Sequence, residues 1–301
     1  MSVVTASRYN AIQTKVANVL GTGSGDKGYG QSVTSGQVAA GDEVTATHIA
    51  NLRTDINKCI LHQTGSATTA IVAPVTGDTI VEDNSTTKKG WAQYESTATT
   101  AETNRLTANS GNMTTTSKIT EQRTNAWGSS PDTINTTFTV TFSSADIKRN
   151  YFNAGGEIHM ALSLSSGSGS KGSSWSSLFS GAGTIKFRRT DTTTTGSGTT
   201  TSIGNVDMTG SHQTIFSKAV GGGGVYAEND FNITAKDNSS TVLEFIVTLN
   251  DDDSGDQTGT GGPVDENVGG TTTLTVSSFR PTNASAVTFA DPSFSTTDNF
   301  N

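Results

Sequence analysis

The chain has 301 residues, of which 32% are hydrophobic and only 15% are charged, against about 25% charged residues in an average globular protein. Its formal net charge of −8 argues against nucleic-acid binding, which requires a basic surface to displace counterions. The single cysteine, Cys59, excludes a disulfide framework and a cysteine-based zinc cluster, and no run of about 18 apolar residues indicates insertion into a membrane.

Thr, Ser, Gly and Asn take the place of the missing charged and apolar residues. Because Thr is β-branched and favours strands, this composition is typical of antiparallel sheets with one solvated face and many turns. The opening segment "MSVVTASRYN" has neither the basic start nor the apolar core of a signal peptide. We therefore expect a mainly β protein that is made in a cytoplasm and stays soluble or assembles there.

Two amphipathic helices are predicted near the start of the chain. In "SRYNAIQTKVANVLG" the apolar residues recur every three or four positions, as on one face of a helix, with Ser7 as a candidate N-cap and Gly21 as a stop. A second such stripe follows in "THIANLRTDINKCILHQTG", where Thr45 or Thr47 can cap the start and Gly65 the end.

Residues 1–65 are therefore predicted to form a two-helix docking module. Two short helices bury little surface alone, so we expect them to pack on each other and on a partner chain. The apolar side chains expected at this interface are Tyr9, Ile12, Val16, Ile49, Leu52 and Ile56.

The connector between the two helices contains "GTGSGDKGYG", residues 21–30, which matches the G-x-G-x-x-G pattern of a dinucleotide-binding loop. That loop requires a strand before the glycines and a helix directly after them, whereas here a helix precedes and a turn-like run follows. A P-loop is excluded as well, because Tyr29 stands where its lysine is needed. We interpret the stretch as a glycine-rich connector with Asp26 and Lys27 at a solvated tip.

Residues 66–130 are polar and contain few apolar side chains, and we predict that they form a linker. A partial apolar stripe predicts one helix within it, at about residues 91–106. The Thr-rich stretch that follows is expected to be extended. Pro131 and Asp132 mark the boundary with the next domain.

Residues 131–301 contain many short runs in which apolar and polar residues alternate. A period of two is typical of strands with one buried face, and turn residues separate the runs. Many short strands of this kind favour an antiparallel β-sandwich, jelly-roll-like in form, with low-complexity pieces such as "SSGSGSKGSS" as loop tips. The predicted strands lie in "NTTFTVTFS", "GEIHMALSLS", "TIKFRRT", "QTIFSKAV", "AENDFNITAKD", "TVLEFIVTLND", "TTTLTVSSF" and "SAVTFAD".

No set of residues in the sequence has the spacing of a catalytic site. The histidines His48, His62, His159 and His212 lack the i, i+2 or i, i+4 spacing of metal ligands, and His62 is expected to pack at a helix end or to cap it as an imidazolium. The run "GSGSK" has Lys171 where the G-x-S-x-G nucleophile motif needs its last glycine. We therefore predict a protein that is not an enzyme and has no organic cofactor; a depolymerase is the enzymatic alternative.

The acidic stretch "NDDDSGDQ", which begins at Asn250, is the strongest candidate for an ion site. Its side chains Asp251, Asp253 and Asp256 resemble part of a Ca²⁺ loop, because hard cations bind several carboxylate oxygens. The spacing of an EF-hand, with its distant Glu, is absent. The alternative is a solvated hairpin tip, where charge discourages edge-to-edge aggregation.

Trp175 and Tyr226 are candidate binding residues in the predicted β-domain. Together with the acidic stretch they would contact a ligand such as a host surface glycan. The alternative for Trp175, in "SSWSSLF", is packing in a core or at a subunit interface.

Three segments of the sequence are distinctive: "RYNAIQTKVANVLGTGSGDKGYGQ", "ATHIANLRTDINKCILHQTG" and, later in the chain, "RNYFNAGGEIHMALSLSSGS". They resemble segments of virion structural proteins of tailed bacteriophages, especially T4-like phages of marine cyanobacteria. Together the three segments cover about a fifth of the sequence. The family adds no catalytic residues, and the rest of the chain is similar to it in composition only.

The resemblance implies a structural component of a phage virion, assembled in the host cytoplasm. A tail or neck fibre or appendage subunit would dock to other virion proteins through its N-terminus, project a β-rich domain and form a homo-oligomer, expected to be a trimer. The alternatives are a capsid decoration or head-fibre protein and a receptor module that binds a host glycan.

Overall fold

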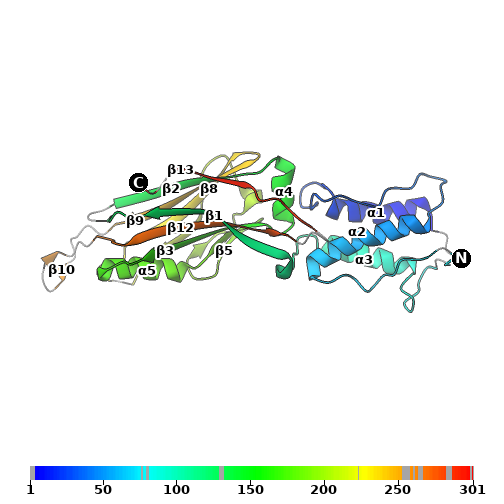
Figure 1. Ribbon diagram of the computed structural model, residues 1–301, viewed down its shortest axis with the longest axis horizontal. Coiled ribbons are helices and arrows are strands. Elements are labelled where there is room, and N and C mark those ends of the chain that lie inside the picture. Colours follow the sequence, from blue (N-terminus) through cyan, green and yellow to red (C-terminus); the bar gives the residue numbers. More distant parts are fainter. Residues whose placement is uncertain are drawn as a thin grey trace. The chain divides into compact units, whose positions relative to one another are not determined.

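The chain forms two compact units in a computed structural model, and each unit is described here by itself (Figure 1). Unit 1 consists of Met1–Thr114, Asp146–Gly156 and Arg280–Ala290, and unit 2 of Thr115–Ala145, Glu157–Phe279 and Asp291–Asn301. Because the segments alternate, the chain crosses between the units five times. The structure describes residues 4–75, 77–78, 81–128, 132–222, 224–252, 258–259, 262–263, 267–282, 287–298 and 300.

Unit 1 is helical. Its helices are α1 (Ala6–Leu20), α2 (Ala46–Thr64), α3 (Trp91–Thr103) and α4 (Ala145–Asn153), with a short 3-10 helix at Ser110–Asn112. The N-cap of α1 is Thr5, whose hydroxyl accepts a hydrogen bond from the backbone N–H of Arg8 (3.2 Å), so the expectation of Ser7 was wrong. The expected Thr45 caps α2 in a reciprocal pair with His48, and Gly65 ends that helix at φ +82°.

The predicted linker of residues 66–130 is not a linker in the structure. The helix expected near residues 91–106 is present as α3, and Trp91 and Tyr94 on it are buried against α1, with the Trp91 ring 6.4 Å from that of Tyr9. Arg8 strengthens this packing because it binds both Glu82 (2.6 Å) and Glu95 (2.7 Å). The ion pair with Arg8 lowers the pKa of Glu95.

The polar composition of residues 66–130 was misleading because α3 buries aromatic and small side chains rather than a stripe of large aliphatic ones.

The glycine-rich connector folds back onto unit 1. The backbone N–H groups of Tyr29 and Gln31 donate to the carbonyls of Val19 and Leu20 at the end of α1 (2.8 Å each). Its expected solvated tip is tied down, since Lys27 binds Glu102 at 2.9 Å and Asp26 binds Arg105.

Unit 2 contains two antiparallel sheets, one of five strands and one of six. In spatial order the first consists of β1 (Met113–Arg123), β12 (Thr271–Pro281), β3 (Glu157–Ser165), β4 (Ile185–Phe187) and β5 (Thr192–Thr194). The second consists of β13 (Ser293–Asp298), β2 (Asp132–Thr141), β9 (Val242–Asp251), β8 (Asp230–Ser239), β7 (Gln213–Ala219) and β6 (Thr199–Thr200). The unit also contains a two-stranded pair, β10 (Thr258–Gly259) and β11 (Gly262–Pro263), and a 3-10 helix at Asn205–Asp207.

The inward faces of the two sheets meet through aromatic side chains. Phe138 of β2 lies directly opposite Phe245 of β9, with parallel rings 5.0 Å apart. Phe187 of β4, in the other sheet, meets Phe245 edge to face at 5.3 Å. The alternation of buried and solvated residues along β2 and β9 confirms the period of two in the sequence.

The low-complexity run before Trp175 was wrongly expected to be a loop. It begins α5 (Gly169–Ala182), which packs on β3 and ends at Gly183 with φ +66°. Trp175, Leu178 and Phe179 are buried at helical spacing. Ser and Gly are weak helix formers, so tertiary packing rather than local propensity sets this helix.

The last predicted strand, "SAVTFAD", was also misplaced. Of its described residues, 287–290 belong to unit 1, where Thr288 forms an isolated bridge with Thr282. The strand that pairs with β2 is β13, farther along the chain. Within the described residues, no helix has the length and apolar character to cross a membrane.

Candidate functional site

The six apolar side chains predicted to bind a partner chain lie in the interior of unit 1. None is more than 3% exposed. In this fold they hold the helices of one chain together, and their role in docking stays a prediction. They are Tyr9, Ile12, Val16, Ile49, Leu52 and Ile56.

The other predicted binding residues are also buried. Trp175 is fully covered and meets Trp127 edge to face at 4.8 Å, and Tyr226 is 7% exposed. Asp251 is buried at the end of β9 with its Oδ2 2.8 Å from the Nζ of Lys171, so it is not part of a solvated hairpin tip. Asp253 and Asp256 lie outside the described residues. No group of three or more potential metal ligands occurs in the described part of the chain.

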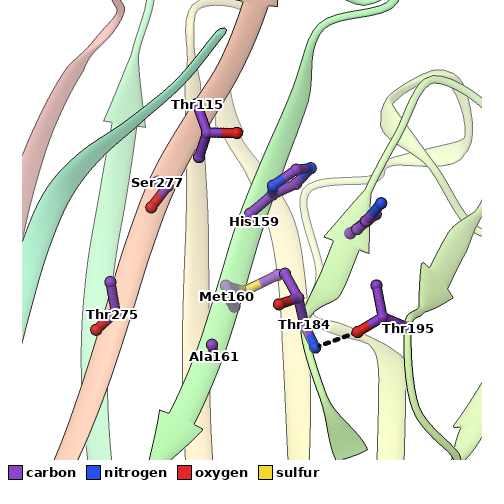
Figure 2. A pocket seen from close by; sticks show the side chains of 9 residues that line it. Thr115, His159, Met160, Ala161, Thr184, Thr195, Thr275 and Ser277 are labelled. Carbon is purple, nitrogen blue, oxygen red and sulfur yellow. Dashed lines mark hydrogen bonds between the residues drawn. The ribbon is translucent and has the colours of Figure 1, made fainter. Parts of the chain in front are cut away.

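A groove of about 350 Å³, lined by both polar and apolar surface, lies on the five-stranded sheet of unit 2 (Figure 2). Its side chains come mainly from β3 and β12, from β4 and from the residues that flank β4 and β5. The lining residues are Thr115, His159, Met160, Ala161, Thr184, Lys186, Thr195, Thr275 and Ser277.

Strand register places three polar residues of the groove, Ser277, His159 and Lys186, in one row across the sheet. His159 lies opposite Ser277 of β12 on one side and Lys186 of β4 on the other, and Thr275 lies opposite Ala161. Directly opposite residues share a face of an antiparallel sheet, and this face alternates with the buried residues Ile158, Met160 and Leu162. No pattern in the sequence indicates this groove, because the three residues become neighbours only through strand register.

His159 is held in place from two sides. Its Nε2 lies 2.6 Å from Oε2 of Glu157, and its ring stacks on Phe279 with 5.1 Å between centroids. The Nε of Arg188 lies 3.6 Å from the other oxygen of Glu157. Glu157 is therefore already engaged by two basic groups, and it positions the imidazole.

Apart from Met160 and Ala161, the remaining lining residues carry hydrogen-bonding side chains. The hydroxyl of Thr195 accepts from the backbone N–H of Thr184 at 2.8 Å (Figure 2), which leaves its own hydrogen for a ligand. Each Ser or Thr hydroxyl both donates and accepts, and Lys186 adds a cation. The groove is suited to a ligand rich in hydroxyl or anionic oxygen atoms.

A second polar network, which the sequence did not reveal, lies on β8 and β9. The hydroxyl of Thr234 lies 3.1 Å from Nδ1 of His212, and Nε2 of His212 lies 3.1 Å from Glu244. Lys236 also binds Glu244 (2.8 Å), and this hydrogen bond, followed by that of His212, lowers the pKa of Glu244. The network fastens the segment before β7 to its neighbouring strands.

Comparison with known proteins gives no further guide. No protein-family model matches the chain, and neither curated proteins nor solved structures match it significantly.

Proposed function

We propose that this chain is a structural component of a tailed-phage virion, a tail or neck fibre or appendage subunit. Unit 1 would dock to other virion proteins and unit 2 would be the projecting part. The observation that carries the proposal is that the two N-terminal phage-like segments and the first eight residues of the third, 149–156, meet in unit 1.

The contacts between these segments are specific. Arg149 of α4 donates from Nη1 to the carbonyl of Lys27 (2.6 Å) and from Nη2 to that of Thr22 (2.8 Å). Asn153, also on α4, donates to the carbonyls of Gly25 (3.1 Å) and Lys27 (3.2 Å). The start of the third segment thus binds the glycine-rich connector of the first, more than 100 residues away. Segments that build one unit together support a resemblance at the level of a folded module.

The architecture of unit 2 also supports a structural role. We infer that its two sheets form a β-sandwich, since Phe187 and Phe245 join them. The chain passes from β1 in one sheet to β2 in the other and back to β3, as in a jelly-roll-like sandwich, although β7, β8 and β9 form a simple meander. A non-enzymatic role is consistent with the state of Glu157, since this carboxylate beside the groove residue His159 is already engaged by His159 and Arg188.

Gold-labelled antibodies against the chain, applied to purified particles of the phage that encodes it, test the proposal. We expect label on the tail or neck. Label on the head would favour the alternative of a capsid decoration or head-fibre protein. If the antibody binds neither intact particles nor the proteins of dissociated particles, both the tail or neck role and the capsid role are contradicted.

A glycan-binding receptor module is the second candidate, and the groove on the five-stranded sheet favours it. A glycan array probed with the full chain should show binding that Lys186→Ala removes. Ser163→Ala, on the same face of β3 but outside the groove lining, is the matched control. Equal signals from the wild type and Lys186→Ala would count against binding in the groove.

A further inference from the structure

A lysine and an aspartate are enclosed together in the interior of unit 2. Lys171 at the start of α5 and Asp251 at the end of β9 have fully buried side chains, with Nζ 2.8 Å from Oδ2. The lysine also donates to the carbonyl of Gly128 (2.7 Å) and lies over the ring of Tyr226, 5.8 Å from its centroid. Trp127 and Trp175, next to these residues in sequence, pack edge to face.

Gly128 lets the backbone lie close to the carboxyl group of Asp251. It has φ +71°, a conformation that favours glycine. A Cβ atom at this position would overlap Oδ2 of Asp251. A glycine is therefore required here both by its backbone and by the space that the carboxyl group occupies.

A third side chain, Asp132, faces the same site. In the register of β2 and β9 it lies directly opposite Asp251, so the Cβ atoms are about 5 Å apart on the same face. Its Oδ2 accepts a hydrogen bond from the N–H of Gly128 at 3.2 Å. Asp132, Lys171 and Asp251 are thus gathered around one residue.

We propose that Lys171 and Asp251 form an intramolecular amide cross-link. Two buried ions are costly, and transfer of a proton from the ammonium to the carboxylate leaves a neutral amine and a neutral carboxyl group, which a dry site tolerates better. A desolvated lysine amine is a nucleophile. Since the carboxyl carbon is bonded to the oxygen that Nζ contacts, the reacting atoms are near the roughly 3–3.5 Å of a near-attack pair.

The reaction balances without an oxidant or a cofactor. A bond forms between Nζ of Lys171 and Cγ of Asp251, and a C–O bond of the carboxyl group breaks. The departing hydroxyl takes one proton from the nitrogen and leaves as one molecule of water. Asp132 relays that proton. The product joins residues 80 positions apart, so it clamps α5 to β9 and stabilises unit 2 against unfolding.

Mass spectrometry of the purified full-length chain under denaturing conditions tests the proposal. We expect a mass one water below that of the sequence, and a protease digest that yields one branched peptide containing Lys171 and Asp251. A folded wild-type chain that keeps its full mass after prolonged incubation, with the two peptides recovered separately, would overturn the proposal.

Variants separate the cross-link from other dehydrations. A cyclic imide at an aspartate also loses one water, but Lys171→Met abolishes only the amide. The matched control is Lys118→Met, which removes the partly exposed Lys118–Asp291 pair at the similar distance of 2.7 Å and should keep the mass loss. A mass loss that persists in Lys171→Met would contradict the assignment.

The role of Asp132 is tested by the rate of linkage. Asp132→Asn keeps a side-chain oxygen for the Gly128 N–H but cannot relay a proton as a carboxylate does. We expect linkage to slow by roughly 100-fold, the usual effect of losing one general acid or base. An unchanged rate would remove Asp132 from the proposal.

Discussion

Individual glycines decide whether the connector between α1 and α2 can fold back. Gly25 and Gly28 both have positive φ (+58° and +102°), but a Cβ at Gly25 would meet nothing within 4 Å, whereas one at Gly28 would overlap the carbonyl oxygen of Thr22. We expect Gly28→Ala to lower the free energy of unfolding by about 3 kcal/mol and Gly25→Ala by about 1 kcal/mol. Urea denaturation measures both, and equal losses would contradict the crowding at Gly28.

His62 should make unit 1 sensitive to acid. Its side chain is fully buried, and the centroid of its ring lies 4.8 Å from that of Tyr29. Neither ring nitrogen makes a hydrogen bond to a described residue. The backbone of Ala154 lies close to the ring but without the geometry of a hydrogen bond. Burial lowers the pKa of His62 from 6.5 to about 4. Of its two expected roles, packing at the helix end is therefore the one observed, and capping as an imidazolium is not.

The sign of the pH effect follows from this lowered pKa. Between pH 6.5 and 4 the unfolded chain binds a proton that the folded chain does not, so the free energy of unfolding should fall as pH falls, by up to roughly 3 kcal/mol. His62→Phe should flatten this part of the urea-midpoint profile. Ile60→Val, a control on the same helix, should lower stability equally at each pH. A wild-type slope retained in His62→Phe would refute the account.

Helix α4 is the element that holds the connector in place. Arg149→Met removes two hydrogen bonds, to the carbonyls of Lys27 and Thr22. It should lower the free energy of unfolding by about 3 kcal/mol, since each hydrogen bond from a charged donor contributes at least about 1.5 kcal/mol. Hydrogen exchange of the Tyr29, Gly30 and Gln31 amides should quicken. Arg188→Met, which removes a more exposed arginine of unit 2, should leave those amides unchanged; equal protection in Arg149→Met would contradict the role of α4.

Helices and strands whose apolar residues recur with a regular period could be predicted from the sequence. Elements that depend on tertiary contacts could not. The stripes of α1 and α2 and the alternation in β2, β8 and β9 were found from the sequence because apolar residues mark the buried face. Helix α5 was missed because Ser and Gly hide its three buried residues. The groove was missed because His159, Lys186 and Ser277 become neighbours only through strand register.

At the scale of the whole molecule, the units are not consecutive stretches of chain. Unit 1 needs Asp146–Gly156 and Arg280–Ala290, and Phe289 packs on Tyr151 (6.0 Å) while Gln31 exchanges hydrogen bonds with the backbone of Thr288. A fragment of residues 1–114 should therefore unfold at a lower temperature than unit 1 does in the full chain. Circular dichroism of both would show it, and an unchanged helical transition would mean that the later segments add nothing.

A homo-oligomer remains part of the proposal. As a fibre subunit the full chain should have the solution mass of a closed homo-oligomer, the usual arrangement of identical subunits, and the expected number of copies is three. A monomer that persists at high concentration would argue against a self-assembling fibre and favour a protein organised by the particle.

The claim that this chain is a virion component is tested most directly by mass spectrometry of proteins from purified phage particles. The account predicts its peptides at a fixed number of copies per particle that survives repeated purification. Peptides found only in the lysate of infected cells, and absent from the particles, would contradict it.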